Sequence, residues 1–268
     1  EAVLAESKNL QLYSDPDCTE ITKQAAELFG VKPSQMFFGN GSDEILDYCF
    51  YGFCSKENPV VFPDITYGFY SVFAELYGIE TKIIPLKEDF SVDYEDYVNK
   101  DRLTVIANPN APTGMSIPVW QIEEIVKTNP DTVVVIDEAY VDFGARSCVP
   151  LIKKYDNLLV TQTFSKSRSM AGARLGFGVA SEKIINKING ATFKGNTAQK
   201  GGGAINNEGN ITSVNAEFTS NSVANGNGGA IYNFKNKITS IISSFVSNRA
   251  KRGGAIHNKG LASIDTLS

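Results

Sequence analysis

The sequence predicts an α/β domain with a mainly parallel sheet and flanking helices, followed by a short right-handed parallel β-helix of repeats. In residues 1–188, amphipathic helical patterns alternate with short apolar segments. Residues 189–268 instead repeat a Gly- and Asn-rich pattern. The charge changes near the same place: residues 187–268 contain nine Lys or Arg and three Asp or Glu, whereas the preceding part has a net charge of −11. We therefore expect two domains, 1–188 and 189–268.

A helix is expected first, over residues 17–29. Ile21, Ala25 and Leu28 recur there at helical spacing, so we expect them on one face of the helix. Gly30 is typical of a residue that ends a helix.

Strands and further helices follow. We expect a short strand at Met36–Phe38, after which Gly-Asn-Gly-Ser at 39–42 leads into a second helical pattern. Three later segments are mostly apolar and rich in β-branched residues, which indicates parallel strands buried on both faces. These segments are Leu103–Ala107, Thr132–Ile136 and Leu158–Thr163. Residues 118–128 have the pattern of a crossover helix, and such a βαβ series places functional residues at the carboxyl ends of its strands.

The last third of the chain contains an internal repeat. Phe-x-x-Asn is followed each time by Gly-Gly-Ala-Ile, and the second motif recurs at spacings of 26 and 25 residues. The first motif is Phe193/Asn196, Phe218/Asn221 and Phe245/Asn248, and the second is Gly202–Ile205, Gly228–Ile231 and Gly253–Ile256. This period is typical of a solenoid, and short apolar strands with Asn-rich corners favour a β-helix. A disordered polar linker is the alternative.

Composition excludes several classes of protein. The net charge of −5 gives no basic surface for nucleic acid, and no apolar run of about 18 residues is present, so we expect no membrane span. Residues 1–12 lack the features of a signal peptide, so we expect a cytoplasmic protein, and the start without Met suggests a fragment. The four cysteines lack metal-site spacing, and His257 is the single histidine. We therefore expect no metal, and a catalyst that uses Lys, Asp, Tyr or Ser.

Polar residues suited to one cofactor chemistry follow two successive predicted strands. Asp137 can hold a ring nitrogen protonated, and Tyr140 can bond a phenolic oxygen. After the next strand, Lys166 can form a Schiff base with an aldehyde, while Ser165 and Arg174 can bind a phosphate. Each has a structural alternative, such as a turn cap for Asp137 or a solvated side chain for Lys166. Their order at successive strand ends is far more specific.

The segment Thr163–Gly172, continued by Arg174-Leu-Gly, resembles the lysine-attachment signature of class-II pyridoxal-phosphate aminotransferases. Other segments resemble the histidinol-phosphate aminotransferase family. They are Tyr13–Pro16, Gly39–Glu44, Thr66–Tyr70, Asn108–Gly114 and Asp137–Phe143. The resemblance covers residues 1 to about 188. It implies an incomplete large domain of the fold-type-I transferases, pyridoxal 5'-phosphate as cofactor, and transamination between histidinol phosphate and 2-oxoglutarate in histidine biosynthesis.

The resemblance also implies a role for each matched catalytic or ring-binding residue. Lys166 would hold the cofactor and then shuttle a proton between the substrate α-carbon and carbon C4′ of the cofactor. Asp137 would pair with the pyridine nitrogen, and Tyr140 would bond the ring hydroxyl. Tyr67 would stack on the ring, with a core aromatic as the alternative. Many related enzymes have an Asn beside the ring hydroxyl where this chain has Ala, so either Asn110 or Tyr140 alone makes that contact.

The cofactor phosphate would lie at the start of the second helix. Gly41, Ser42 and Asp43 would present backbone N–H groups to it, with Ser165 and Arg174 completing the site. A simple Gly-rich turn is the alternative for this loop.

A homodimer is implied as well. Tyr13 resembles the tyrosine that reaches the phosphate of the partner subunit's cofactor, although a turn-packing aromatic is the alternative. The family's small domain, which supplies an arginine for the substrate carboxylate, has no match after about residue 188. We therefore expect impaired turnover.

Residues 191–262 resemble the repeats of polymorphic outer-membrane proteins and adhesin-like β-helix proteins, which implies a fusion. The sequence thus predicts a pyridoxal-phosphate-dependent aminotransferase whose substrates are a small amino acid or amino alcohol phosphate and a 2-oxo acid. The alternatives are a surface adhesin-like repeat protein and a joined fragment with neither function.

Overall fold

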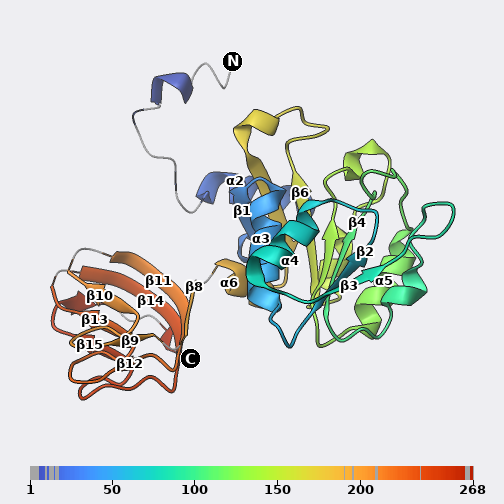
Figure 1. Ribbon diagram of the computed structural model, residues 1–268. Helices are drawn as coiled ribbons and strands as arrows, with labels where there is room; N and C mark the ends of the chain where they lie inside the picture. The colour runs from blue at the N-terminus through green and yellow to red at the C-terminus, as the bar shows by residue number, and fades with distance from the viewer. Residues whose placement is uncertain are drawn as a thin grey trace. The chain divides into compact units, whose positions relative to one another are not determined.

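The computed structural model describes residues 6–9, 11, 15, 18–189, 191–194, 196–208, 211–235, 237–262 and 266–267. The chain divides into two compact units, residues 1–188 (unit 1) and residues 189–268 (unit 2). Both units are drawn in Figure 1.

Unit 1 is built on one sheet. Among its described residues, the strand order is β1-β7-β6-β5-β4-β2-β3 (Figure 1). The strands are β1 (Met36–Asn40), β2 (Val60–Pro63), β3 (Thr81–Ile84), β4 (Leu103–Ala107), β5 (Val134–Asp137), β6 (Leu158–Thr163) and β7 (Leu175–Ala180). β7 runs antiparallel to β1 and β6, whereas the pairs from β6 to β3 are parallel. The mainly parallel α/β sheet predicted from the sequence is therefore confirmed.

Helices cover both faces of this sheet. The α-helices are α2 (Thr19–Phe29), α3 (Ser42–Phe53), α4 (Phe69–Tyr77), α5 (Val119–Thr128) and α6 (Glu182–Asn189). Short 3₁₀ helices lie at Ser7–Asn9, Pro33–Gln35, Tyr94–Tyr97, Val141–Phe143, Val149–Lys153 and Ala171–Ala173. None of the described helices has the length and apolar character needed to cross a bilayer.

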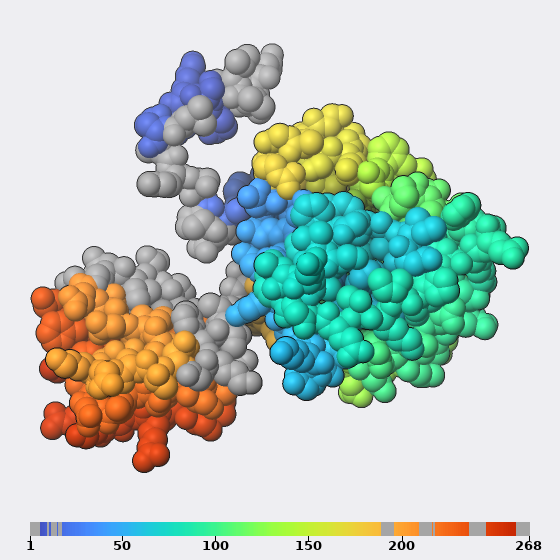
Figure 2. All heavy atoms as spheres, viewed as in Figure 1, coloured from blue at the N-terminus to red at the C-terminus, as the bar shows by residue number. Residues whose placement is uncertain are grey.

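An apolar core lies between the sheet and the helices on each of its two faces. α3, α4 and α6 pack on one face of the sheet, and α2 and α5 pack on the other. In the space-filling view, the segments that contain α3 and α4 cover the first of these faces (Figure 2). Alternate residues of β4 belong to different cores. Val105 packs in the core under α3, α4 and α6, and Ile106 packs in the core under α2 and α5. Both sides of the central strands are thus covered, which explains why their sequences are apolar throughout.

Most of the predicted elements of unit 1 are present at the expected positions. The strands Leu103–Ala107 and Leu158–Thr163 are confirmed, as is the helix within 118–128. Of the residues expected on one face of α2, Ile21 and Ala25 pack against the core, whereas Leu28 is 79% exposed. Ala26, which is 1% exposed, is the buried residue of this helix. α2 packs at the β1–β7 side of the sheet, where Ala26 and Phe29 make the contact and Leu28 points away.

Unit 2 consists of strands that pair in parallel between successive repeats. They are β8 (Ala191–Lys194), β9 (Thr197–Ala198), β10 (Ile205–Asn207), β11 (Ile211–Thr219), β12 (Ser222–Val223), β13 (Ile231–Asn233), β14 (Lys237–Val246), β15 (Ile256–Asn258), β16 (Leu261–Ala262) and β17 (Thr266–Leu267). The register joins equivalent repeat positions, as in the row Ile205, Ile231 and Ile256.

The Asn residues of Phe-x-x-Asn form a stack. Asn221 is fully buried, and its Oδ1 accepts hydrogen bonds from the backbone N and Nδ2 of Asn196, at 3.0 and 2.8 Å. In turn, Nδ2 of Asn221 donates to Oδ1 of Asn248 at 3.0 Å. A second stack joins Asn207, Asn233 and Asn258. Each repeat thus satisfies the polar groups of its neighbour.

The Gly-Gly-Ala-Ile motifs have a backbone explanation. Their first glycines all have positive φ, at 53°, 70° and 63° for Gly202, Gly228 and Gly253. The second glycines of the first two motifs lie against the next repeat: a Cβ on Gly203 would overlap the carbonyl oxygen of Gly229, and a Cβ on Gly229 that of Gly254. Glycine is required at both positions, the first by conformation and the second by close approach.

We predict that Asn221→Ala destabilises unit 2 by about 2–4 kcal/mol, because it removes the hydrogen bonds of Asn221 to Asn196 and Asn248 and leaves a cavity where a fully buried side chain was. Hydrogen exchange of the strand amides in residues 205–258 measures this change without requiring unit 1 to unfold. Asn225→Ala is the control, since Asn225 is exposed in the same repeat. Equal loss of protection in the two variants would show that the stack contributes no stability.

Candidate active site

The candidate site lies at the edge of the sheet where β4, β5 and β6 end. Asp137 is the last residue of β5, and Lys166 follows β6 by three residues. Because β7 runs in the opposite direction, its first residue lies at this same edge, and Arg174 directly precedes it. β1 also ends here and leads through Gly41 into α3. One reversed strand thus brings a cation to the carboxyl ends of the others.

A pocket of about 190 Å³ opens at this edge. Eight of the predicted site residues line it: Ser42, Asp43, Tyr67, Asp137, Tyr140, Ser165, Lys166 and Arg174. Ala107, Pro109, Ala111, Ala139, Thr163 and Ala171 complete the wall. Gly41 adjoins it as the residue before α3. Tyr13 falls outside the described residues.

Asp137 is the most deeply placed ionisable group of the pocket, with 4% of its surface exposed. Its Oδ2 accepts a hydrogen bond from the hydroxyl of Tyr70 at 2.8 Å, and its Oδ1 accepts one from the backbone N of Ala139 at 3.1 Å. Burial raises the pKa of Asp137 to about 6, against the opposing effect of these two bonds and of Lys166. The carboxylate is therefore ionised at neutral pH but destabilised by its surroundings.

Lys166 lies on an exposed loop beside the ring of Tyr140. Its Nζ is 5.1 Å from the ring centroid, within the range of a cation–π contact. At the base of the loop, Thr163 Oγ1 donates to Ser165 Oγ at 3.0 Å. The amine of Lys166 and the phenol of Tyr140 thus both line the pocket that Asp137 lines.

Buried polar contacts tie the Lys166 loop to the segment after β5. Glu138 is 1% exposed, and its carboxylate accepts from Gln162 Nε2 at 2.9 Å and from Ser147 Oγ at 2.7 Å. Gln162 Oε1 accepts from Arg168, whose guanidinium also pairs with Asp142 at 3.4 Å. Burial raises the pKa of Glu138, and the hydrogen bonds oppose that shift. These contacts hold the two loops in a fixed relation.

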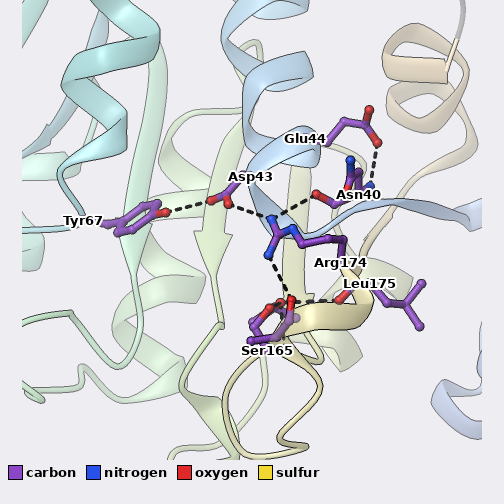
Figure 3. A network of polar contacts seen from close by, with 9 residues as sticks. Asn40, Asp43, Glu44, Tyr67, Ser165, Arg174 and Leu175 are labelled. Carbon is purple, nitrogen blue, oxygen red and sulfur yellow. Dashed lines mark hydrogen bonds and ion pairs between the residues drawn. The ribbon is translucent and has the colours of Figure 1, made fainter.

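The start of α3 faces the guanidinium of Arg174 (Figure 3). Arg174 Nη2 lies 3.2 Å from Asp43 Oδ2 and 3.3 Å from the carbonyl oxygen of Asn40. Tyr67 donates its hydroxyl to the other oxygen of Asp43 at 2.8 Å, and burial together with Asp43 raises the pKa of Tyr67. A helix N-terminus and a guanidinium at one side of a pocket form a site suited to an anion.

Gly176 explains how closely β7 approaches this helix start. A Cβ on Gly176 would overlap the backbone of Gly41 and Ser42. Gly41 itself has φ of 82°, and a Cβ there would lie 2.6 Å from Arg174 Nη2. The absence of side chains at both glycines lets Arg174 reach the helix start.

Asn110 is not brought to the wall of this pocket. Its side chain is buried, accepts from Thr66 Oγ1 at 2.8 Å, and donates to the carbonyl oxygen of Ile65 at 2.8 Å and to Thr113 Oγ1 at 3.1 Å. The amide stabilises its own loop, while Ala111 lines the pocket. Of the two residues considered for the ring hydroxyl, Tyr140 lines the pocket and Asn110 does not.

Comparison with known proteins identifies the family. Residues 1–204 match the family described as aminotransferase class I and II. This chain belongs to that family. A histidinol-phosphate aminotransferase of Brachyspira hyodysenteriae is 48% identical over 190 residues, which cover 70% of this chain and 54% of the relative. The chain thus spans about half the length of the curated relatives it matches.

Solved structures agree with this assignment. The histidinol-phosphate aminotransferase of Clostridium acetobutylicum matches with a TM-score of 0.63 and 27% identity, over 70% of this chain and 57% of that one. The histidinol-phosphate aminotransferase of Sinorhizobium meliloti, solved in complex with pyridoxal-5'-phosphate, has the same fold with a TM-score of 0.66, 24% identity, and coverage of 70% and 53%.

Sequence reasoning missed Tyr70, Glu138 and Gln162. Tyr70 lies in the aromatic-rich segment that was matched to the family, but nothing in the local pattern shows that its hydroxyl reaches a carboxylate 67 residues away. One signal could have found Tyr70. A tyrosine buried among apolar residues needs a hydrogen-bond partner for its hydroxyl, so a polar partner for Tyr70 was to be expected.

We predict that the stability difference between Asp137→Asn and the wild type depends on pH. Between the ordinary pKa of an aspartate and about 6, the folded protein retains a proton that the unfolded chain has lost, so the wild type loses stability as pH rises through this window. The difference in the free energy of unfolding shifts in favour of the variant by about 2 kcal/mol between pH 4 and pH 7. Urea unfolding of unit 1 across this range measures it.

Asp131→Asn provides the control, because its carboxylate is exposed near the start of the same strand. Parallel pH profiles for the wild type and Asp137→Asn would contradict the raised pKa.

Proposed function

We propose that unit 1 binds pyridoxal 5'-phosphate and performs amino transfer, most like the exchange between histidinol phosphate and 2-oxoglutarate in histidine biosynthesis. The observation that carries this proposal is the convergence of Lys166, Asp137 and Arg174 on one pocket beside the start of α3. Membership of the class I and II aminotransferases supports it, and so does the identity with named histidinol-phosphate aminotransferases. On the same grounds we propose a cytoplasmic location.

The pocket fits this cofactor on three counts. A buried carboxylate, Asp137, lies where a cationic ring nitrogen would be stabilised. A primary amine, Lys166, lies on the same wall for covalent attachment of an aldehyde. Arg174 and the first turn of α3 form the anion site for a phosphate, with Ser42 and Ser165 as further hydroxyl donors. Tyr67 would stack on the ring and Tyr140 would bond its hydroxyl.

The chain's own residues then provide the chemistry of proton transfer. Pyridoxal phosphate, when bound, supplies an aldehyde and a ring that delocalises negative charge from the substrate α-carbon. Asp137 keeps the proton on the ring nitrogen by its negative charge, which burial makes more effective than in water. Lys166 Nζ would accept the proton of the substrate α-carbon and deliver it to carbon C4′ of the cofactor. Tyr140 lies within 5.1 Å of Nζ and limits where the amine moves.

The homodimer remains part of the proposal. Tyr13 resembles a residue that completes the phosphate site of a partner subunit, and the phosphate subsite here is formed on one side by Arg174 and α3. A second copy that contributes Tyr13 would cover this subsite from outside.

We further propose that unit 2 is a right-handed parallel β-helix of about three repeats joined to the aminotransferase domain of residues 1–188. Parallel pairing at the repeat period, the two Asn stacks and the paired Phe218 and Phe245 rings, with centroids 5.0 Å apart and 4° between planes, support it. Its resemblance to adhesin-like proteins makes surface binding the second function considered for this unit.

We predict that pyridoxal phosphate becomes attached to Lys166. After incubation with the cofactor and reduction with borohydride, peptide mass spectrometry should find the label on the peptide that contains Lys166. Lys183→Ala, which removes an exposed lysine of α6, should label like the wild type, and Lys166→Ala should not. Label spread over surface lysines and unchanged in Lys166→Ala would refute the assignment.

We also predict Lys166-dependent exchange of the substrate's α-hydrogen with solvent. With pyridoxal phosphate present, proton NMR should show loss of deuterium from histidinol phosphate labelled at the α-carbon, faster than with the cofactor alone. Lys166→Ala should reduce the rate to that of the cofactor alone, because the proton acceptor is removed. Exchange from other amino acids but not from histidinol phosphate would contradict the substrate assignment.

A further inference from the structure

We propose that Tyr70 is the positioning residue of the pocket: its hydroxyl holds the Asp137 carboxylate in one orientation and keeps it facing the ligand. This inference rests on the proposed function, because it assigns to Tyr70 a role toward the cofactor that Asp137 would meet. Tyr70 does not line the pocket and acts only through Asp137.

The carboxylate is held from two directions. Tyr70 belongs to α4 and donates to Oδ2 at 2.8 Å, whereas the Ala139 backbone, from the segment after β5, donates to Oδ1 at 3.1 Å. Two donors on different oxygens fix the plane of a carboxylate, and each oxygen retains a further acceptor site. Asp137 therefore presents a preset acceptor to the pocket before any ligand enters.

The ring of Tyr70 is itself immobilised. It is fully buried and packs against three aromatic rings, with centroid distances of 6.3 Å to Phe50, 5.8 Å to Phe62 and 5.7 Å to Tyr67. The last two contacts are edge-to-face, an arrangement that favours one ring plane. Because the ring has no room to turn, the hydroxyl has one direction in which to donate.

The hydroxyl also opposes the destabilisation of the buried charge. Burial and the Asp137 charge raise the pKa of Tyr70 well above its ordinary value, so the hydroxyl remains a donor at neutral pH. Around Asp137, Asp43 disfavours the ionised carboxylate, while Lys166 and the Ala139 N–H favour it. Of these groups, Tyr70 gives the largest favourable contribution.

The structure contains a matched pair outside the pocket. Tyr77, at the other end of α4, donates its hydroxyl to Asp47 Oδ1 of α3, also at 2.8 Å. Neither residue lines the candidate site. Tyr77→Phe therefore removes the same atom from the same kind of bond, a tyrosine of α4 donating to an aspartate, without touching Asp137.

The first test titrates the cofactor-free protein. Carbon-13 NMR of protein labelled at the aspartate carboxyl carbons follows Asp137, whose signal is assigned by its loss in Asp137→Asn. Tyr70→Phe should raise the pKa of Asp137 by about one unit, the effect of losing one hydrogen bond to a charged group. Tyr77→Phe should leave it unchanged. An unchanged value in Tyr70→Phe, or equal shifts in both variants, would overturn the proposal.

The second test measures the dissociation constant of pyridoxal phosphate in a double-mutant cycle. Tyr70→Phe should weaken binding about tenfold when Asp137 is present, and should have no effect in the Asp137→Asn background. Equal weakening in both backgrounds would mean that Tyr70 acts by general packing, which overturns the proposal. Failure of the wild type to bind the cofactor would refute the proposed function instead, while the NMR titration would still decide the role of Tyr70.

Discussion

The burial of one carboxylate at the end of β5 is the constraint on which the architecture of the pocket depends. A charge removed from water requires compensation, and around Asp137 this comes from a buried phenol, a backbone amide and a lysine on the next loop. Each compensating group belongs to a different segment: α4, the turn after β5 and the loop after β6. Sheet, helix and loop must therefore be assembled before Asp137 can be tolerated, so the site is a product of the complete fold of unit 1.

The direction of β7 determines the rest of the pocket. An all-parallel sheet would leave the start of the strand beside β6 at the far edge, away from Asp137. The reversed strand places Arg174 at the same edge, and Gly176 lets it lie directly against the start of α3. Arg174 and Asp137 thus lie at the same edge of the sheet, Arg174 because β7 begins there and Asp137 because β5 ends there.

Sequence patterns predicted the central strands, and patterns together with the family resemblance named most of the residues that line the pocket. A strand covered on both faces must be apolar throughout, and residues at successive carboxyl ends must converge. β7 and the contacts of Tyr70, Glu138 and Asn110 depend instead on which distant segment packs opposite, which no local pattern records. The exposure of Leu28 has the same origin, because a helical stripe indicates which residues share a face but not how far the neighbouring sheet extends. In unit 2 the neighbour of each repeat is the next repeat, so its pairing register follows the period visible in the sequence.

The Asn stacks of unit 2 have a consequence for how this part of the chain can change in length. Asn196, Asn221 and Asn248 are hydrogen-bonded in series, and the backbone of each repeat lies against the next. Adding or losing a few residues within a paired strand shifts every later Asn out of line, whereas gain or loss of one entire repeat restores the alignment. Length variation in the strands of unit 2 is therefore expected to come in whole multiples of the repeat.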